Sequence, residues 1–280
     1  LHRRVAADVA DEELAKLVDT LNRMIGRLQT SFGALRRFTA DASHELKTPL
    51  TVVRADVGRA MHPGASNEER MQVLEEAMAE VARMSDLVDG LLTLARADEG
   101  RFEVYREPIR LEPLARDVFE TAVILGEEAG VSVALPLVED ATVMGDATRL
   151  RQLFLNLITN AIKYTPRGGH VEITLSLRNN DEVGFAVRDT GVGIAAADLE
   201  LIFDRFWRAD RVRSRKPTDG RGTVDRGGFG LGLSIAQWIA QAHGGSLTAQ
   251  SRLARGSIFT VLLPVAKADA DAPPSPEKPA

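Results

Sequence analysis

The stretch NLITNAIKY, residues 156–164, places Asn156, Asn160 and Lys163 on one face of a helix, because they are spaced four and three residues apart. The rest of this helix is largely apolar, so two amides and one ammonium group on it are unfavourable unless they meet a polar partner. A polyphosphate with Mg²⁺ would satisfy them, because a carboxamide oxygen suits a hard cation and Lys163 suits phosphate charge. Capping amides at a helix C-terminus are the alternative explanation for this segment alone.

Around this stretch, from Phe102 to Pro264, short runs rich in valine and isoleucine are interspersed with amphipathic runs. The first kind predicts strands and the second kind predicts helices, so we expect a mixed α+β domain. The expected strands are Phe102–Leu111, Val131–Leu135, Val171–Leu177, Val183–Arg188, Ser246–Gln250 and Ser257–Leu263. The expected helices are Glu112–Glu128, Ala147–Tyr164 and Leu231–His243.

Two glycine-rich segments follow in this domain: DTGVGI, residues 189–194, after a strand, and GFGLGL, residues 228–233, at the start of a helix. Glycine lets the backbone approach a ligand closely, and a helix N-terminus favours phosphate. A buried Asp189 after a strand is suited to accept a hydrogen bond from an exocyclic amine such as that of adenine, which would select ATP.

Other nucleotide-binding motifs fit the sequence less well. Gly191, Gly193 and Ala196 match the loose dinucleotide fingerprint, but a charged loop follows them instead of a βαβ unit. The chain contains no Gly-Lys dipeptide, which excludes a P-loop.

The segment between Phe206 and Gly228 is strongly basic and has few apolar residues. We interpret it as a mobile lid over an anion, with a solvated disordered loop as the alternative, and both descriptions hold together if no ligand is bound. Its cationic residues are Arg208, Arg211, Arg213, Arg215, Lys216, Arg221 and Arg226.

The N-terminal third of the chain is helical in pattern. We expect one helix from about Asp8 to Leu35, a second over Phe38–Met61, a break at His62–Asn67 and a return helix that opens with Glu68 and Glu69. The return helix carries a coiled-coil seam, so two such hairpins could pair as a four-helix dimer. The seam residues are Leu74, Ala77, Val81, Met84, Val88, Leu91 and Ala95.

The segment HELKTP, residues 44–49, puts Pro49 inside a helix, where proline costs about 3 kcal/mol. Such a cost suggests a purpose. The imidazole of His44 can attack phosphorus, and Glu45 can hydrogen-bond or deprotonate the other ring nitrogen. An ordinary surface histidine is the alternative for an isolated His-Glu pair. A zinc-protease motif would need a second histidine where Thr48 stands, so metal-dependent hydrolysis is unsupported.

Composition sets wider limits on function. The 280 residues have room for two domains, and the net charge of −5 gives no general electrostatic reason to bind nucleic acid or an anionic membrane. Without cysteine there is no disulfide or thiolate metal site. No apolar run approaches the ~20 residues that cross a bilayer, and a chain that begins with Leu1 looks like a fragment.

Taken together and in this order, the segments from about Asp8 to Pro264 resemble the sensor histidine kinases of two-component systems. Residues 38–51 are similar to the H box of that family, which implies that His44 is the phosphoacceptor and Glu45 its acid-base partner. Thr48 matches the position that orients water when the partner response regulator is dephosphorylated. The implied activity is ATP-dependent autophosphorylation of His44, followed by phosphotransfer to an aspartate of the regulator.

The resemblance also implies a nucleotide site. Residues 156–164 resemble the N box, with Asn160 as the Mg²⁺ ligand, and residues 102–266 are expected to form the Bergerat ATP-binding sandwich. The other residues implied around ATP are Asn156, Lys163 and Tyr164 of the N box, Asp189, Gly191 and Gly193 of the G1 box, Phe206 of the F box, and Gly228, Gly230, Leu231 and Gly232 of the G2 box. Phe203 also matches the F box. The lid is long, so no individual lid arginine is assigned.

The implied organisation is an all-α helical hairpin, dimeric as a four-helix bundle, followed by the sandwich. The expected parts are the end of a HAMP-like signalling helix at 1–31, a dimerisation and phosphotransfer domain at 32–99, the ATP-binding domain at 102–266 and a disordered tail at 267–280. We expect a homodimer whose full-length form is membrane-anchored, with this part on the cytoplasmic side of the bacterial inner membrane.

Two other functions are weighed against this one. A Bergerat-fold ATPase or chaperone-like machine would hydrolyse ATP without a histidine intermediate, and His44 within its motif argues against it. A coiled-coil scaffold with a degenerate ATP site would be no enzyme, and the intact glycine and amide positions argue against that.

Overall fold

A computed structural model describes residues 12–98, 105–179, 181–208 and 228–266. The chain divides into two compact units, Leu1–Asp89 and Gly90–Ala280. Residues 1–11 of the expected HAMP-like helix, residues 99–104, most of the expected lid and the expected tail at 267–280 lie outside the described residues.

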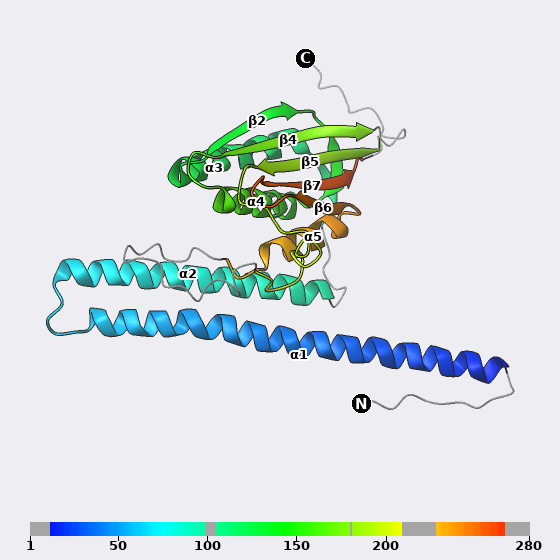
Figure 1. Cartoon of the computed structure of the whole chain (residues 1–280), viewed down its shortest axis with the longest axis horizontal. Helices are drawn as coiled ribbons and strands as arrows, with labels where there is room; N and C mark the ends of the chain where they lie inside the picture. Colours follow the sequence, from blue (N-terminus) through cyan, green and yellow to red (C-terminus); the bar gives the residue numbers. More distant parts are fainter. Residues whose placement is uncertain (1–11, 99–104, 180, 209–227, 267–280) are drawn as a thin grey trace, which may run out of the picture. The chain divides into compact units, whose positions relative to one another are not determined.

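The first unit is built on a helical hairpin, and the last turns of its second helix, from Gly90, belong to the second unit. Helix α1 spans Glu12–Ala60 and helix α2 spans Asn67–Asp98, running antiparallel to it (Figure 1). Ser66 and Glu69 form a reciprocal cap at the start of α2: the Ser66 amide donates to the Glu69 carboxylate at 2.8 Å, and the Glu69 amide donates to Ser66 Oγ at 3.2 Å. The turn between the helices therefore lies where the sequence predicted it.

Helix α1 is continuous where the sequence suggested two helices. The expected boundary between Leu35 and Phe38 is wrong, because the intervening arginines are good helix formers and no proline or turn sequence interrupts them. Pro49 lies inside α1 and is buried, which confirms that the helix runs through a proline.

Much of the apolar surface of the hairpin stays exposed in the single chain. On α2, Val73 and Ala77 are buried, whereas Leu74 and Val81 are 44% and 43% exposed. Leu17 on α1 is 63% exposed. The hairpin thus buries one apolar stripe and leaves another exposed to water.

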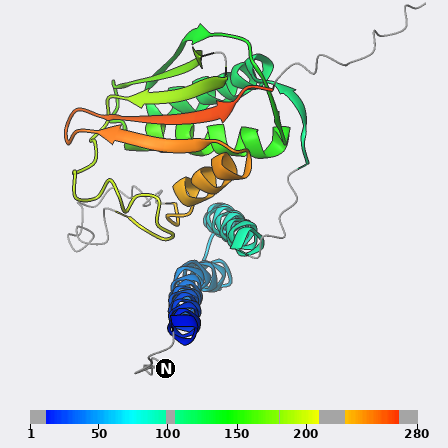
Figure 2. The same ribbon diagram turned by 90° about the vertical axis from the view of Figure 1, so that its right-hand side faces the viewer.

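The second unit is a five-stranded sheet with helices on one face (Figures 1 and 2). The strands in spatial order are β2 (Ser132–Val138), β4 (His170–Asn179), β5 (Glu182–Asp189), β7 (Ser257–Pro264) and β6 (Ser246–Ser251). The pair β2–β4 is parallel and the other pairs are antiparallel. The covering helices are α3 (Leu111–Ala129), α4 (Ala147–Tyr164) and α5 (Gly232–Ala242). The α+β prediction is confirmed.

Helix α4 packs its apolar face on the centre of the sheet. Phe154 of α4 stacks on Phe185 of β5 with ring centroids 3.8 Å apart, and both side chains are fully buried. Leu153, Leu157 and Ile158 complete the buried face. This burial leaves only the opposite side of α4 free for polar residues.

The second unit also contains a small two-stranded sheet. Strand β1 (Glu107–Arg110) pairs antiparallel with β3 (Thr142–Gly145). The sequence missed β3, since a four-residue strand carries almost no periodic signal. The expected strand Phe102–Leu111 is too long at its C-terminal end, because Leu111 is the first residue of α3.

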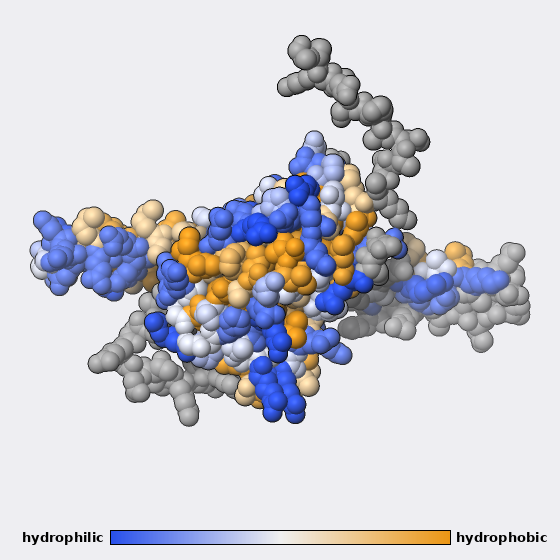
Figure 3. Space-filling model, turned by 90° about the horizontal axis from the view of Figure 1, so that it is seen from above, coloured by the Kyte–Doolittle hydropathy of each residue, from blue (hydrophilic) through white to orange (hydrophobic). Residues whose placement is uncertain are grey.

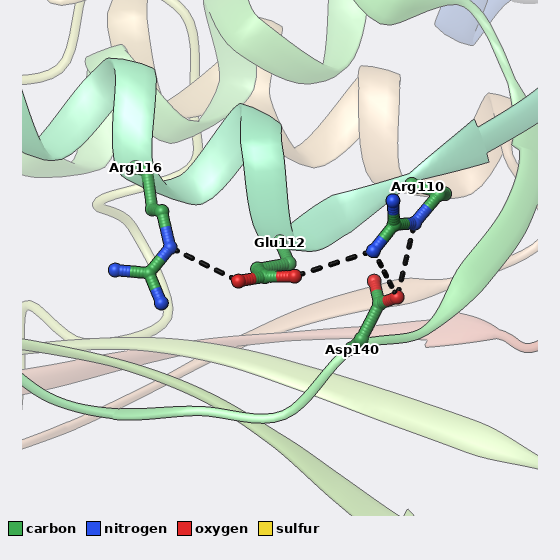
Figure 4. Close-up of polar contacts among 4 residues, drawn as sticks. All are labelled: Arg110, Glu112, Arg116 and Asp140. Atoms are coloured by element: carbon green, nitrogen blue, oxygen red, sulfur yellow. Dashed lines mark hydrogen bonds and ion pairs between the residues drawn. The ribbon is translucent and has the colours of Figure 1, made fainter.

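An ion-pair cluster fastens the start of α3 to the β2–β3 turn (Figure 4). Arg110 donates to Asp140 through Nη2 at 2.6 Å and Nε at 3.0 Å, and Glu112 links Arg110 to Arg116. The hydrogen bond and charge of Asp140 raise the pKa of Arg110. Arg110, Arg116 and Asp140 are exposed and Glu112 is partly exposed, so we assign the cluster a positional role more than a large stabilising one.

The surface of the second unit mixes apolar and hydrophilic residues (Figure 3). Ile124, Leu137 and Leu177 are among its exposed apolar side chains. Across the described ranges, no helix combines the length and apolar character that a membrane span requires.

We predict that Phe154→Ala lowers the free energy of unfolding by about 3–5 kcal/mol, because it removes a stacked ring from a close-packed core. Urea denaturation of the second unit, followed by circular dichroism, measures the change. The matched control is Ile124→Ala, at a side chain that is 61% exposed, for which we expect less than about 0.5 kcal/mol. Equal effects of the two substitutions would contradict this description of the core.

Candidate functional site

The polar stripe of α4 faces the start of α5. Asn156 Nδ2 donates to the carbonyl oxygen of Gly232 at 3.1 Å. A Cβ atom on Gly232 would lie 3.8 Å from Asn160 Nδ2, which is ordinary contact distance. The structure therefore brings together two segments that are more than 70 residues apart in the sequence.

Asn160 is half-buried, and within the described parts of the chain its amide has no recorded hydrogen bond. The exposed part of this amide can reach water, so its oxygen is available to a ligand or a cation. Lys163 and Tyr164 are exposed at the end of α4, with Lys163 Nζ 4.9 Å from the centre of the Tyr164 ring. No group of three or more His, Asp or Glu in the described ranges could hold a metal ion.

Asp189, the last residue of β5, is only 5% exposed. Its Oδ1 accepts hydrogen bonds from the amides of Gly191 at 2.8 Å and Ser257 at 3.2 Å. Burial raises the pKa of Asp189, and these hydrogen bonds partly oppose that shift. Both of these backbone bonds end on Oδ1, and the Ser257 side chain also hydrogen-bonds to the carboxyl group. A carboxyl group has two oxygens with about four acceptor sites, so capacity for a further donor remains.

The glycines after Asp189 are required by close backbone contacts. A Cβ on Gly191 would lie 2.5 Å from the carbonyl oxygen of Tyr164. Gly193 has φ of +67° and a Cβ there would lie 2.1 Å from the carbonyl oxygen of Arg252. The chain thus passes tightly between the end of α4 and the β6–β7 turn, which a side chain at either glycine would prevent.

Phe206 and Gly230 meet although residues 209–227 lie between them. The Phe206 amide donates to the Gly230 carbonyl at 3.0 Å, and a Cβ on Gly230 would lie 2.7 Å from the carbonyl oxygen of Trp207. Phe206 is buried with φ of +60°, an uncommon conformation for an aromatic residue. Leu231 is also buried, whereas nothing described lies within 4 Å of a Cβ on Gly228.

Sequence reasoning missed the part that β7 plays in this site. Gly256 has φ of +87°, and a Cβ on it would lie 1.9 Å from the carbonyl oxygen of Asp189. This close approach brings the Ser257 amide onto the Asp189 carboxyl group. The available signal was a glycine directly before a strand, which commonly marks a close backbone approach.

His44 and Thr48 are exposed on α1, one turn apart, and Glu45 beside them is half-buried. Thr48 Oγ1 donates to the His44 carbonyl at 3.4 Å. Pro49 has no amide proton to give to the Glu45 carbonyl, so the helix is weakened directly beside His44. The structure places this histidine segment on the first unit and the α4, Asp189 and glycine segments on the second.

Two protein-family models match the chain. Residues 34–100 match the His Kinase A (phospho-acceptor) domain, and residues 145–267 match the histidine kinase-, DNA gyrase B- and HSP90-like ATPase domain. The first match contains His44 and the second contains the whole Asn160, Asp189 and Gly232 arrangement.

Individual relatives agree with these matches. The sensor protein CutS of Streptomyces coelicolor is 36% identical over 268 residues, which are 95% of this chain and 61% of CutS. The sensor histidine kinase RppB of Synechocystis is 37% identical over 84% of this chain and 50% of RppB. The chain thus spans about three fifths or less of these relatives. A solved structure of full-length ShkA in complex with AMPPNP aligns with a TM-score of 0.61 and 29% identity, over 84% of this chain and 47% of ShkA.

We predict that Asp189→Asn stabilises the chain more at pH 7.5 than at pH 5. The folded state raises the pKa of this carboxyl group, so it binds the proton more tightly than the unfolded chain does. The contribution of Asp189 to stability is therefore present below its unfolded pKa, near 4, and is lost as the pH rises through the folded value. Urea denaturation of both proteins at the two pH values measures the difference, and a larger loss of stability at pH 7.5 than at pH 5 would contradict it.

Proposed function

The chain belongs to the family of sensor histidine kinases, and from that premise we propose that it binds ATP in its second unit and transfers the γ-phosphate to His44. The observation that carries this proposal is that an exposed histidine beside a mid-helix proline occurs in the same chain as the Asp189 and Asn160 site. Neither feature alone would distinguish a kinase from an ATPase.

We propose that Asp189 recognises the adenine base. The exocyclic amine of adenine can donate to the Asp189 carboxyl group, which has acceptor sites beyond those that the Gly191 and Ser257 amides use on Oδ1. Gly191 and Gly193 allow the backbone to lie close to the base, and the segment from Gly228 to Gly232 offers amide groups at the start of α5 to the phosphates. Lys163 and Tyr164, both exposed at the end of α4, line the same site.

The arrangement also fits Mg²⁺. The half-buried amide of Asn160 offers a hard oxygen ligand, and the absence of a carboxylate cluster in the described ranges fits a cation held mainly by the phosphates and water. Bound there, Mg²⁺ would neutralise charge on the phosphates. Asn156, which is tied to the Gly232 carbonyl, would hold Asn160 and the start of α5 at the correct spacing.

The transfer itself is an in-line displacement. A ring nitrogen of His44 forms a bond to the γ-phosphorus while the bond from that phosphorus to the β–γ bridging oxygen breaks, and ADP leaves with the electron pair. Glu45 accepts or holds the proton of the other ring nitrogen, which keeps the attacking nitrogen unprotonated. Positioning and charge neutralisation supply most of the rate enhancement.

We further propose that the chain acts as a homodimer and passes its phosphate to an aspartate of a response regulator. The exposed seam residues Leu74 and Val81 support the dimer, because a second hairpin would cover them. We also propose that Thr48, which is exposed one turn from His44, orients water for dephosphorylation of the regulator. In the full-length protein we propose a HAMP-like segment and a membrane anchor before this part, on the cytoplasmic side.

A Bergerat-fold ATPase without a histidine intermediate is the second candidate. The ATP-binding half would serve either function equally well. The match of residues 34–100 to a phospho-acceptor domain favours the kinase.

We predict that incubation with γ-labelled ATP and Mg²⁺ gives acid-labile, base-stable labelled protein. His44→Gln should abolish the label, and Asn160→Ala should reduce its rate of formation by about 100-fold, because it removes a charge-stabilising ligand. His62→Gln, at another exposed histidine of the same unit, is the matched control and should label normally. Label that survives His44→Gln would move the acceptor elsewhere, and ATP turnover without label would favour the ATPase.

We predict that Thr48→Ala loses dephosphorylation of the regulator while autophosphorylation stays within about threefold of the wild-type rate, since an exposed hydroxyl is removed from the helix surface. The control is Thr51→Ala, because Thr51 makes the same kind of bond to a carbonyl one turn back, to Lys47 at 2.8 Å. Release of phosphate from a phosphorylated regulator measures the first activity. Equal loss of both activities would contradict the role proposed for Thr48.

A further inference from the structure

His243 lies buried between the end of α5 and the start of α4, with 4% of its surface exposed. Its Nε2 accepts a hydrogen bond from the Asp146 amide at 3.0 Å, and its Nδ1 lies 2.8 Å from the Ile239 carbonyl. An amide can only donate and a carbonyl can only accept. The neutral ring therefore carries its proton on Nδ1 and its lone pair on Nε2.

The ring supplies a partner to two backbone groups at helix ends. Helix α5 ends with the Gly245 amide bonded to the Ala240 carbonyl and with Gly244 at φ of +75°. The carbonyl of Ile239, one residue earlier, accepts hydrogen bonds from the backbone amide and the ring of His243. The Asp146 amide precedes α4 and has no partner within that helix, so it needs an acceptor from elsewhere.

Gly145 makes room for this ring. A Cβ at Gly145 would lie 2.4 Å from Cδ2 of His243 and 2.8 Å from its Nε2. The imidazole is rigid and buried, so it has little freedom to move away from such a contact. The backbone before α4 and the side chain after α5 are thus fitted to each other.

Helices α4 and α5 lie side by side under the sheet (Figure 1) and are joined at two places. Asn156 bonds to Gly232 at the start of α5, and Asp146 bonds to His243 at its end. The two attachment points on α4 are about 15 Å apart along the helix axis, and the two on α5 are separated by a similar distance. Two such attachments prevent one helix from sliding or pivoting against the other.

We propose that His243 is a positioning residue for nucleotide binding, which keeps α4 and α5 in register so that Asn160 and the Gly232 segment face the same ligand. This inference rests on the proposed nucleotide site. The ring of His243 hydrogen-bonds to Asp146 and Ile239 and not to Asn160 or Gly232, so it acts through the two helices.

The pH response follows from the surroundings of the ring. The charged groups that face it are Asp146 before α4 and Arg106, whose Nη2 donates to the Ala242 carbonyl at 3.1 Å, while α5 has no charged side chain of its own. Burial lowers the pKa of His243, Arg106 adds to that shift, and the Ile239 bond and Asp146 oppose it. The native state thus binds the proton less readily than the unfolded chain. The contribution of His243 to the free energy of unfolding is therefore present above the unfolded pKa, near 6.5. It is lost as the pH falls below that value.

Three proteins test the proposal: wild type, His243→Asn and His243→Gln. The Gln amide reaches the position of Nε2 and can still accept from Asp146, whereas the shorter Asn amide reaches only the position of Nδ1. Isothermal titration calorimetry with AMPPNP and Mg²⁺ at pH 7.5 measures the Kd. We expect His243→Asn to weaken binding about tenfold, the factor that corresponds to one typical hydrogen bond, and His243→Gln to stay within about threefold of wild type.

Binding that is equally tight in wild type and His243→Asn would overturn the inference and leave the nucleotide site intact. A wild-type chain that does not bind AMPPNP would instead refute the proposed nucleotide site, and the inference with it. Should His243→Asn fail to fold, His243→Met takes its place, because a thioether fills similar space but is only a weak acceptor for the Asp146 amide. A Kd about tenfold weaker in His243→Met than in His243→Gln supports the proposal, and equal Kd values overturn it.

Discussion

Burial of one face of α4 on the sheet is the constraint from which the second unit is organised. The stacked rings of Phe154 and Phe185 and the neighbouring leucines fix the rotation of the helix about its axis. Once that rotation is fixed, Asn156 and Asn160 must lie on the opposite side, because helical geometry separates the two faces. The start of α5 then packs against this polar side through Gly232. A shift of α4 would move all of these groups at once.

The two units make different demands on their residues. The proposed nucleotide site needs a fixed shape, and its backbone is held by contacts so close that Gly191, Gly193 and Gly256 cannot carry a side chain without a shift. The proposed phosphoacceptor needs access, and His44 lies exposed on a helix that Pro49 weakens on one side. A rigid site for ATP and an accessible nucleophile on a separate unit are consistent with a reaction that requires the two to approach each other.

Long amphipathic elements could be predicted from the sequence, and local tertiary contacts could not. The helix Ala147–Tyr164 has the predicted bounds because its apolar period is strong over five turns. Strand β3 was missed because it has only four residues. The division of α1 at residues 35–38 was wrong because helix propensity stays high there although the apolar pattern is weak. Asp189 was predicted from its place after a strand, but its bond to Ser257 joins residues 68 apart, and no local pattern contains that information.

The most direct test of the account is peptide mapping by mass spectrometry, under neutral to basic conditions that preserve phosphoramidate bonds, after the chain has been incubated with Mg²⁺ and ATP. Phosphotransfer to His44 predicts one phosphoryl group on its imidazole, in the peptide that also contains Pro49, and none on the other histidines. A phosphoryl group on another residue, or an unmodified His44 peptide while ADP accumulates, would contradict it.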